Sequence, residues 1–82
     1  MYTVYMVRCS DGTLYTGISN RLGERLEKHN LGAASRYTAS RRPVRLVYSE
    51  PQPDKNSALK REIAIKKLSR ADKLKLLGDS PQ

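Results

Sequence analysis

The sequence contains no phenylalanine and no tryptophan, and it has one cysteine and one histidine. A single cysteine, Cys9, excludes an internal disulfide and a zinc site built from several cysteines. Apolar residues make up 38% of the 82 residues, below the usual share of about 45–50%, so we expect a thin core. No apolar run approaches the roughly 18 residues of a membrane span, and the N-terminus lacks a signal pattern. These absences predict one small, soluble, cytoplasmic domain.

Positive charge is the most abundant feature that is present. Sixteen lysines and arginines stand against eight acidic residues, giving a formal net charge of +8, and residues 55–75 alone hold eight basic and two acidic side chains. Such an excess favours a polyanionic partner, because each neutralised phosphate releases bound counterions. The alternative is a solvated helix face that keeps the protein in solution. A membrane surface is disfavoured because the basic stretch has no Trp or Phe.

Two stretches rich in β-branched and aromatic residues, Thr3–Arg8 and Leu14–Ser19, predict strands joined in a hairpin. The sequence permits two registers. A two-residue turn would put Tyr5 and Tyr15 on opposite faces of the sheet. A three-residue loop with Gly12 in the left-handed conformation would put both tyrosines on one face.

The middle of the chain predicts one helix and one more strand. We expect Asn20 to cap a helix that runs from Arg21 to about Asn30, with Gly32 ending it. Residues 33–43 are expected to form an exposed basic connection. The run Val44–Tyr48 predicts the third strand.

The C-terminal part predicts a long helix, capped by Asp54 or Asn56 and reaching about Ser69, and a short final helix over Asp72–Leu77. The order β-β-α-β-α-α predicts an α/β (α+β) fold, in which helices pack on a small sheet. We expect a single domain over residues 1–78 and a frayed tail over 79–82.

Glu62 occupies an unusual position on the long helix. A helical wheel places it within the apolar arc of Ala58 and Ile65. A lone carboxylate in such a place is unfavourable unless it is paired or bound to a metal. Two interpretations are therefore open: a metal ligand, or an i, i+4 ion pair with Lys66.

Arg25 and His29 lie four residues apart and flank the apolar stripe of Leu22 and Leu26 on the first helix. They can present a cation and a titratable imidazole to one pocket. Alternatively, His29 is a packed residue with satisfied nitrogens, and Arg25 pairs with a neighbouring glutamate. All five aromatic residues are tyrosines, so their hydroxyl groups are candidates for a polar role, although tyrosine also suits half-buried strands.

Taken in order, these residues resemble the GIY-YIG nuclease superfamily, specifically its small stand-alone bacterial branch. Val4-Tyr5-Met6 stands at the position of the first tyrosine motif and Tyr15-Thr16-Gly17 at that of the second. Arg25, His29 and Glu62 match the family's arginine, histidine and metal-binding glutamate. The intervals Tyr5 to Tyr15, Tyr15 to Arg25 and Arg25 to Glu62 are 10, 10 and 37 residues. The resemblance extends from Thr3 to about Lys73.

The resemblance implies a three-stranded antiparallel sheet flanked by helices, with both tyrosines on the catalytic face, which selects the three-residue loop. It also implies metal-dependent hydrolysis of phosphodiesters. Glu62 would hold Mg²⁺ (or Mn²⁺ in its place), Arg25 would offset charge on the phosphoryl oxygens, and Tyr5 and Tyr15 would orient the water. The general base is Tyr15 by family analogy, or His29, whose ordinary pKa of about 6.5 suits the task better.

Two departures from the family pattern stand out: Val4 and Met6 replace the opening Gly and Ile of the first motif, and the late asparagine is missing, because the last Asn is Asn56. The main hypothesis is a monomeric DNA endonuclease in DNA repair or processing, with a protein partner supplying specificity. The alternative is a non-catalytic nucleic-acid-binding module on the same scaffold, and RNA is a possible ligand for either. The candidate nucleic-acid-binding residues are Arg36, Tyr37, Arg41, Arg42, Lys66 and Lys67.

Overall fold

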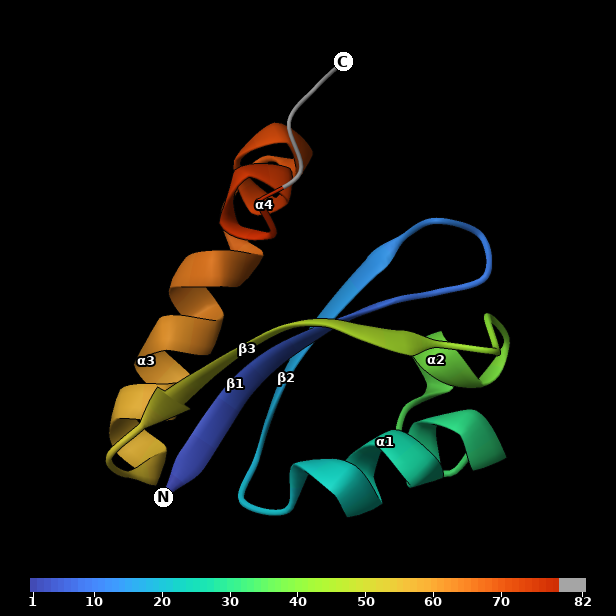
Figure 1. Cartoon of the computed structure of the whole chain (residues 1–82), viewed down its shortest axis with the longest axis horizontal. Coiled ribbons are helices and arrows are strands. Elements are labelled where there is room, and N and C mark those ends of the chain that lie inside the picture. The colour runs from blue at the N-terminus through green and yellow to red at the C-terminus, as the bar shows by residue number, and fades with distance from the viewer. Residues whose placement is uncertain (79–82) are drawn as a thin grey trace.

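A three-stranded antiparallel sheet forms the centre of the fold in the computed structural model, which describes residues 1–78. The strand order is β2-β1-β3. Figure 1 shows α1 and α2 to one side of the sheet and α3, continued by α4, to the other. The sheet and the order of elements confirm the expected α+β fold, with one additional short helix, α2. The elements are β1 (Tyr2–Arg8), β2 (Leu14–Ser19), α1 (Leu22–Leu31), α2 (Arg36–Ala39), β3 (Arg45–Gln52), α3 (Lys55–Lys66) and α4 (Arg70–Leu76).

The β1–β2 hairpin has the three-residue loop. The backbone N–H of Cys9 donates to the Thr13 carbonyl at 2.8 Å, which leaves residues 10–12 as the loop, and Gly12 has φ of 85°. A left-handed residue at the end of a three-residue loop is a common hairpin solution. This loop pairs Val7 with Tyr15 and Tyr5 with Gly17. The register therefore puts both tyrosines on one face.

Side chains alternate across the sheet and form a separate core on each face. On one face, Val4 and Met6 pack with Ala58 and Ile65 of α3. On the other, Tyr5, Val7, Cys9 and Val44 form a buried cluster, against which Tyr15, Leu22 and Leu26 are partly buried. Helices α1 and α3 thus cover opposite faces of the same thin sheet.

The expected cap of α1 at Asn20 is wrong. The cap position is Arg21, and no side chain makes a capping hydrogen bond to this helix end. Instead, the Ser19 hydroxyl accepts from the Arg21 N–H at 2.9 Å, so Ser19 satisfies the backbone just before the helix. The expected stop at Gly32 is confirmed, since this residue has φ of 80° and its N–H donates to the His29 carbonyl.

The segment 33–43 is not wholly an exposed connection. It contains α2, and the Ser35 hydroxyl accepts from the N–H groups of Tyr37 and Thr38 at the N-terminus of this helix. Thr38 has no exposed surface. The segment therefore contributes to the core on the α1 side of the sheet.

The third strand is longer than expected and includes Pro51. Because β3 is at the edge of the sheet, a proline without an N–H is tolerated there. Asp54 caps α3, accepting from the Ser57 N–H at 2.8 Å, so Asp54 and not Asn56 is the cap. The helix ends at Lys66, before the expected Ser69, because Ser69 instead caps α4.

The frayed tail expected over residues 79–82 lies outside the described residues. Over residues 1–78, none of the helices has both the length and the apolar character that crossing a membrane requires.

Candidate active site

Tyr5 and Tyr15 project from neighbouring strands toward the same imidazole. The ring of His29 lies 5.8 Å from the Tyr5 ring and 5.4 Å from the Tyr15 ring, edge-on to both. Gly17 makes this arrangement possible, because a Cβ at this position would lie 2.6 Å from the Tyr5 hydroxyl oxygen. The glycine of the second tyrosine motif thus leaves space for the phenol of the first.

A chain of hydrogen bonds runs from Tyr5 through His29 to Thr38. The Tyr5 hydroxyl is 2.7 Å from His29 Nε2, and His29 Nδ1 is 2.8 Å from Thr38 Oγ1. The Thr38 hydroxyl donates to the Ser35 carbonyl at 3.4 Å, so its oxygen is left to accept from Nδ1–H. We therefore assign the proton of neutral His29 to Nδ1. In that tautomer, Nε2 accepts the hydrogen bond from the Tyr5 hydroxyl.

Burial controls the protonation of this chain. Tyr5 and His29 are 2% and 1% exposed. Burial, reinforced by the nearby Tyr15 and Glu62 and opposed by Arg25, raises the pKa of Tyr5 to about 12. Burial and then the charge of Arg25 lower the pKa of His29 below its ordinary value. At neutral pH the pair is therefore a protonated phenol facing a neutral imidazole.

Arg25 and Glu62 come from α1 and α3, and the charge of each acts on the pKa of Tyr5. Arg25 makes neither of the expected ion pairs with Glu24 or Glu27: within residues 1–78, Glu24 pairs with Arg21 instead, at 3.3 Å. Arg25 also lines a small hollow of about 130 Å³ at the start of α1. Its guanidinium is thus available to an anion.

Glu62 is held close to the sheet by its helix. The neighbouring turns of α3 are fixed by the fully buried Ala58 and Ile65, and the Glu62 side chain is 17% exposed. Its Oε2 lies 3.7 Å from Lys66 Nζ, so the i, i+4 ion pair is present. This contact is long, and the carboxylate accepts no hydrogen bond from the described part of the chain, which leaves lone pairs for a further ligand.

A magnesium ion suits this donor set better than a metal that needs several protein ligands. In residues 1–78, no three His, Cys, Asp or Glu side chains gather to hold a metal ion. Mg²⁺ commonly binds through one or two carboxylates and takes its other ligands from water and phosphate. Glu62 alone fits that pattern.

The residues expected to bind nucleic acid divide into two groups. Arg41 and Arg42 are engaged within the fold: Arg41 bonds to Asp11 and the Tyr37 carbonyl at 3.0 and 2.8 Å, and Arg42 donates to the Ala39 carbonyl at 2.9 Å. Lys66 pairs with Glu62. Arg36, Tyr37 and Lys67 are exposed.

Tyr37 connects this exposed surface to the tyrosine pair. Its ring stacks on Tyr15 with 5.9 Å between centroids and 27° between planes, and the Arg41 guanidinium carbon lies 3.9 Å from the centre of the Tyr37 ring. The Tyr15 hydroxyl makes no hydrogen bond within residues 1–78. The stack therefore holds the Tyr15 ring while its hydroxyl stays available to a ligand.

Sequence reasoning missed two contributors to the site. Thr38 fixes the orientation of His29, and Gly17 clears the space for Tyr5. Gly17 was visible as part of the second tyrosine motif, whereas Thr38 lay within the segment 33–43 that was expected to be an exposed connection. Neither carries a charge or titratable group that would have suggested a role.

Comparison with known proteins identifies the family and the fold. The model of the GIY-YIG catalytic domain matches residues 1–75. The chain belongs to the GIY-YIG family. Two curated relatives of the GIY-YIG domain, the UPF0213 proteins of Staphylococcus aureus strains Mu3 and N315, are each 53% identical to it over 76 residues, which is 93% of either chain.

A solved structure gives the same fold. The solution structure of the UPF0213 protein of Bacillus halodurans superimposes on this GIY-YIG domain with a TM-score of 0.62 and 38% identity, covering 95% of this chain and 84% of the other. The relatives are small stand-alone bacterial proteins of the same kind. Family membership supports a nuclease-like domain and suggests nucleic acid as the substrate. GIY-YIG nucleases are generally metal-dependent.

Proposed function

We propose that this GIY-YIG domain, over residues 1–78, is a cytoplasmic, metal-dependent endonuclease that hydrolyses DNA phosphodiester bonds and acts in DNA repair or processing. The observation that supports the proposal is the buried Tyr5 hydroxyl, which hydrogen-bonds to His29 and whose pKa responds to Tyr15, Arg25 and Glu62. Tyr5 and Tyr15 come from the hairpin, Arg25 and His29 from α1, and Glu62 from α3. No pair of these elements carries all five groups.

The Tyr5–His29 pair provides a path for the proton that the attacking water loses. A phenol with a pKa of about 12 is protonated at neutral pH, so Tyr5 alone cannot act as the base. Neutral His29, however, accepts through Nε2 a hydrogen bond from the Tyr5 hydroxyl at 2.7 Å. As Tyr5 takes a proton from the attacking water, it passes its own proton to His29. Both ring nitrogens of His29 are engaged, by Tyr5 and by Thr38, so the phenol and not the imidazole meets the water and acts as the relay.

The remaining groups act on the phosphate and the water. Arg25 has a fork of donors and offsets the charge that grows on the phosphoryl oxygens. Tyr15, whose hydroxyl has no partner within residues 1–78, orients the water. Glu62 holds Mg²⁺, which supplies a Lewis acid for the phosphoryl and leaving oxygens when it is bound. Mn²⁺ meets the same oxygen-ligand requirement.

The direct test incubates the full chain with labelled branched and single-stranded DNA, with and without Mg²⁺. Metal-dependent products are expected, and Glu62→Gln should lower their rate by at least about 100-fold, a loss typical of removing one key electrostatic group. Glu27→Gln, an exposed α1 carboxylate, is the matched control and should cut normally. Undiminished cleavage by Glu62→Gln would overturn the metal role.

Two observations favour the second candidate, a nucleic-acid-binding module without catalysis. Lys66 already neutralises Glu62, and no asparagine follows Glu62 in the sequence. In that case no substrate is cut, while Glu62→Gln binds DNA as well as the unmodified chain or better, because it loses a negative charge. The same cleavage and binding assays therefore separate the two candidates.

A further inference from the structure

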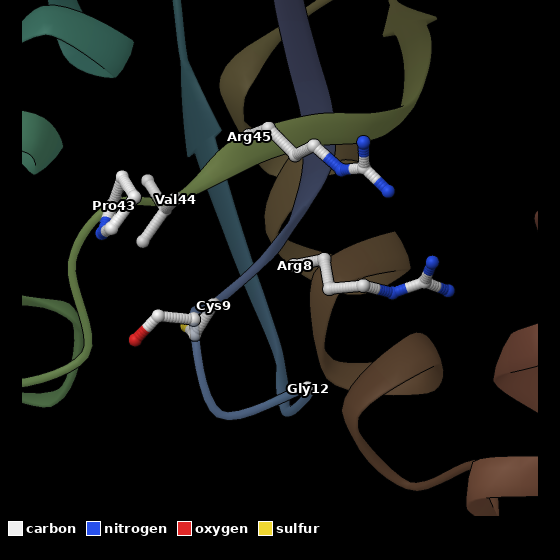
Figure 2. A pocket seen from close by; sticks show the side chains of 7 residues that line it. Arg8, Cys9, Gly12, Pro43, Val44 and Arg45 are labelled. Atoms are coloured by element: carbon white, nitrogen blue, oxygen red, sulfur yellow. The ribbon is translucent and has the colours of Figure 1, made fainter.

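The loop between β1 and β2 is joined by hydrogen bonds to the segment that follows α2. The Arg41 carbonyl accepts from the Ser10 N–H at 2.9 Å and from the Ser10 hydroxyl at 3.0 Å, and Arg41 Nε donates to Asp11 Oδ2 at 3.0 Å. Figure 2 shows this end of the hairpin, where the turn at Gly12 and the segment that leads through Pro43 into β3 line one hollow. We call these three hydrogen bonds the Asp11–Arg41 clamp.

The Asp11 carboxylate is fixed by its own loop. Its Oδ1 accepts from the Thr13 hydroxyl at 2.6 Å and from the Thr13 N–H at 3.1 Å, which leaves Oδ2 for Arg41. The hydrogen bonds from Thr13, and then the charge of Arg41, lower the pKa of Asp11 below its ordinary value. The Arg41 guanidinium therefore has a charged partner in a fixed position at neutral pH.

The same guanidinium holds the Tyr37 ring. Arg41 Nη1 donates to the Tyr37 carbonyl at 2.8 Å, and the guanidinium carbon lies 3.9 Å from the centre of the ring. A planar guanidinium can bind Asp11 and the carbonyl while it stacks on a ring, because its donors have fixed directions. Tyr37 is 38% exposed, so its position depends on these contacts more than on core packing.

Tyr15 lies at the end of this series of contacts. Its ring is edge-on to His29, with 5.4 Å between centroids, and is stacked on Tyr37 with 5.9 Å between centroids. His29 is buried and makes two hydrogen bonds, so the inner contact of the Tyr15 ring is rigid. The outer contact is the Tyr37 ring. Loss of the clamp would therefore free the Tyr15 ring on its exposed side.

We propose that Asp11 and Arg41 are positioning residues that hold the Tyr37 ring against Tyr15 and so fix the place of the Tyr15 hydroxyl. This inference rests on the proposed function, in which Tyr15 orients the attacking water. A displacement of about 1 Å near a reacting centre can lower a rate about 100-fold. Arg41 acts through the two tyrosine rings and not by contact with nucleic acid. The hairpin loop, which carries none of the five proposed catalytic groups, thereby becomes part of the site.

The first test is NMR of the free protein, which needs no substrate. The ring signals of Tyr15 should move toward those of an unstructured tyrosine in Arg41→Gln and in Asp11→Asn. Tyr37→Phe keeps the stacked ring and should leave these signals nearly unchanged. Arg45→Gln is the matched control, because Arg45 is exposed and its side chain points away from the hollow in Figure 2. The clamp side chains are 33% and 45% exposed, so both variants should fold.

The second test compares cleavage with DNA binding. Arg41→Gln should lower kcat at least about tenfold, while its KM and its affinity for DNA in metal-free buffer match those of Arg45→Gln. Weaker DNA binding with an unchanged kcat would identify Arg41 as a DNA contact and overturn the positioning role. Tyr15 ring signals that stay in place in Arg41→Gln and Asp11→Asn would also overturn it. Absence of cleavage by the unmodified chain would count against the nuclease, and the ring signals would still decide whether the clamp positions Tyr15.

Discussion

The contact between Gly17 and Tyr5 gives the sharpest prediction. In Gly17→Ala, the new Cβ would lie 2.6 Å from the Tyr5 hydroxyl oxygen, 2.8 Å from Cζ and 3.1 Å from Cε1. Carbon and oxygen atoms do not approach so closely without a bond, so the ring must move. Tyr5 is 2% exposed and lies in the buried cluster with Val7, Cys9 and Val44, so its ring must move against packed neighbours. A shift of its hydroxyl also breaks the 2.7 Å hydrogen bond to His29.

The magnitude follows from these two effects. Overpacking a core typically costs about 1–3 kcal/mol, and a buried polar group left without its partner costs about 1–3 kcal/mol. We expect Gly17→Ala to lower the free energy of unfolding by about 2–6 kcal/mol, the sum of the two effects. For a chain of this size, that lowers the melting temperature by at least about 8 °C.

The measurement is thermal and urea unfolding followed by circular dichroism. Gly23→Ala is the control, because no heavy atom lies within 4 Å of its Cβ position and alanine suits a helix, so it should be neutral or stabilising by up to about 1 kcal/mol. In a Tyr5→Phe background, Gly17→Ala should cost less, since the hydrogen bond is already gone. A loss below about 0.5 kcal/mol for Gly17→Ala in the unmodified chain would refute the assigned packing.

Three further predictions concern the buried chain of hydrogen bonds. The pKa of His29 is lowered in the folded state, so its contribution to the free energy of unfolding should be complete above pH 6.5 and should fall as the pH drops below that value. Urea unfolding measures this dependence, which should be absent in His29→Gln. Because the pKa of Tyr5 is raised to about 12, its contribution to the free energy of unfolding should persist below pH 10 and be lost between about pH 10 and 12. Ultraviolet titration should detect a phenol that ionises at about pH 12, and this step should disappear in Tyr5→Phe. Thr38→Val removes the partner of His29 Nδ1 and should cost about 1–3 kcal/mol, whereas Thr3→Val, on a half-buried strand position, should change the unfolding free energy little.

Much of the sheet was predictable because its strands carry strong local signals. The alternation of apolar residues located β1 and β2, but the sequence around Gly12 suits two loop lengths. Local chemistry alone therefore left the faces of Tyr5 and Tyr15 undecided, and the family resemblance selected the register that the structure has. Placing these tyrosines also depends on the Cys9–Thr13 hydrogen bond, which no pattern of residue types specifies.

The segment after α1 was harder to predict for a physical reason. Four residues of α2 are too few to produce a helical period, and Ser and Thr are typical of loops. The burial of Thr38 depends on its contact with His29, nine residues away. Arg41 and Arg42 look like a basic binding surface in the sequence, yet much of their donor capacity is used on backbone carbonyls and Asp11. Basic residues in a loop predict a partner that accepts their hydrogen bonds, but the sequence does not say whether this partner lies within the same chain.

The placement of α1 and α3 on opposite faces of the sheet has a consequence for chain cleavage. A break near Pro53, between β3 and α3, would yield one piece with both phenols, the imidazole and Arg25, and another piece with the carboxylate of Glu62. Neither piece would have the complete set of groups. Only reassociation of the pieces through the Val4–Ala58–Ile65 core would restore the set, so recovery of the proposed cleavage after mixing the pieces would measure reassembly of the fold.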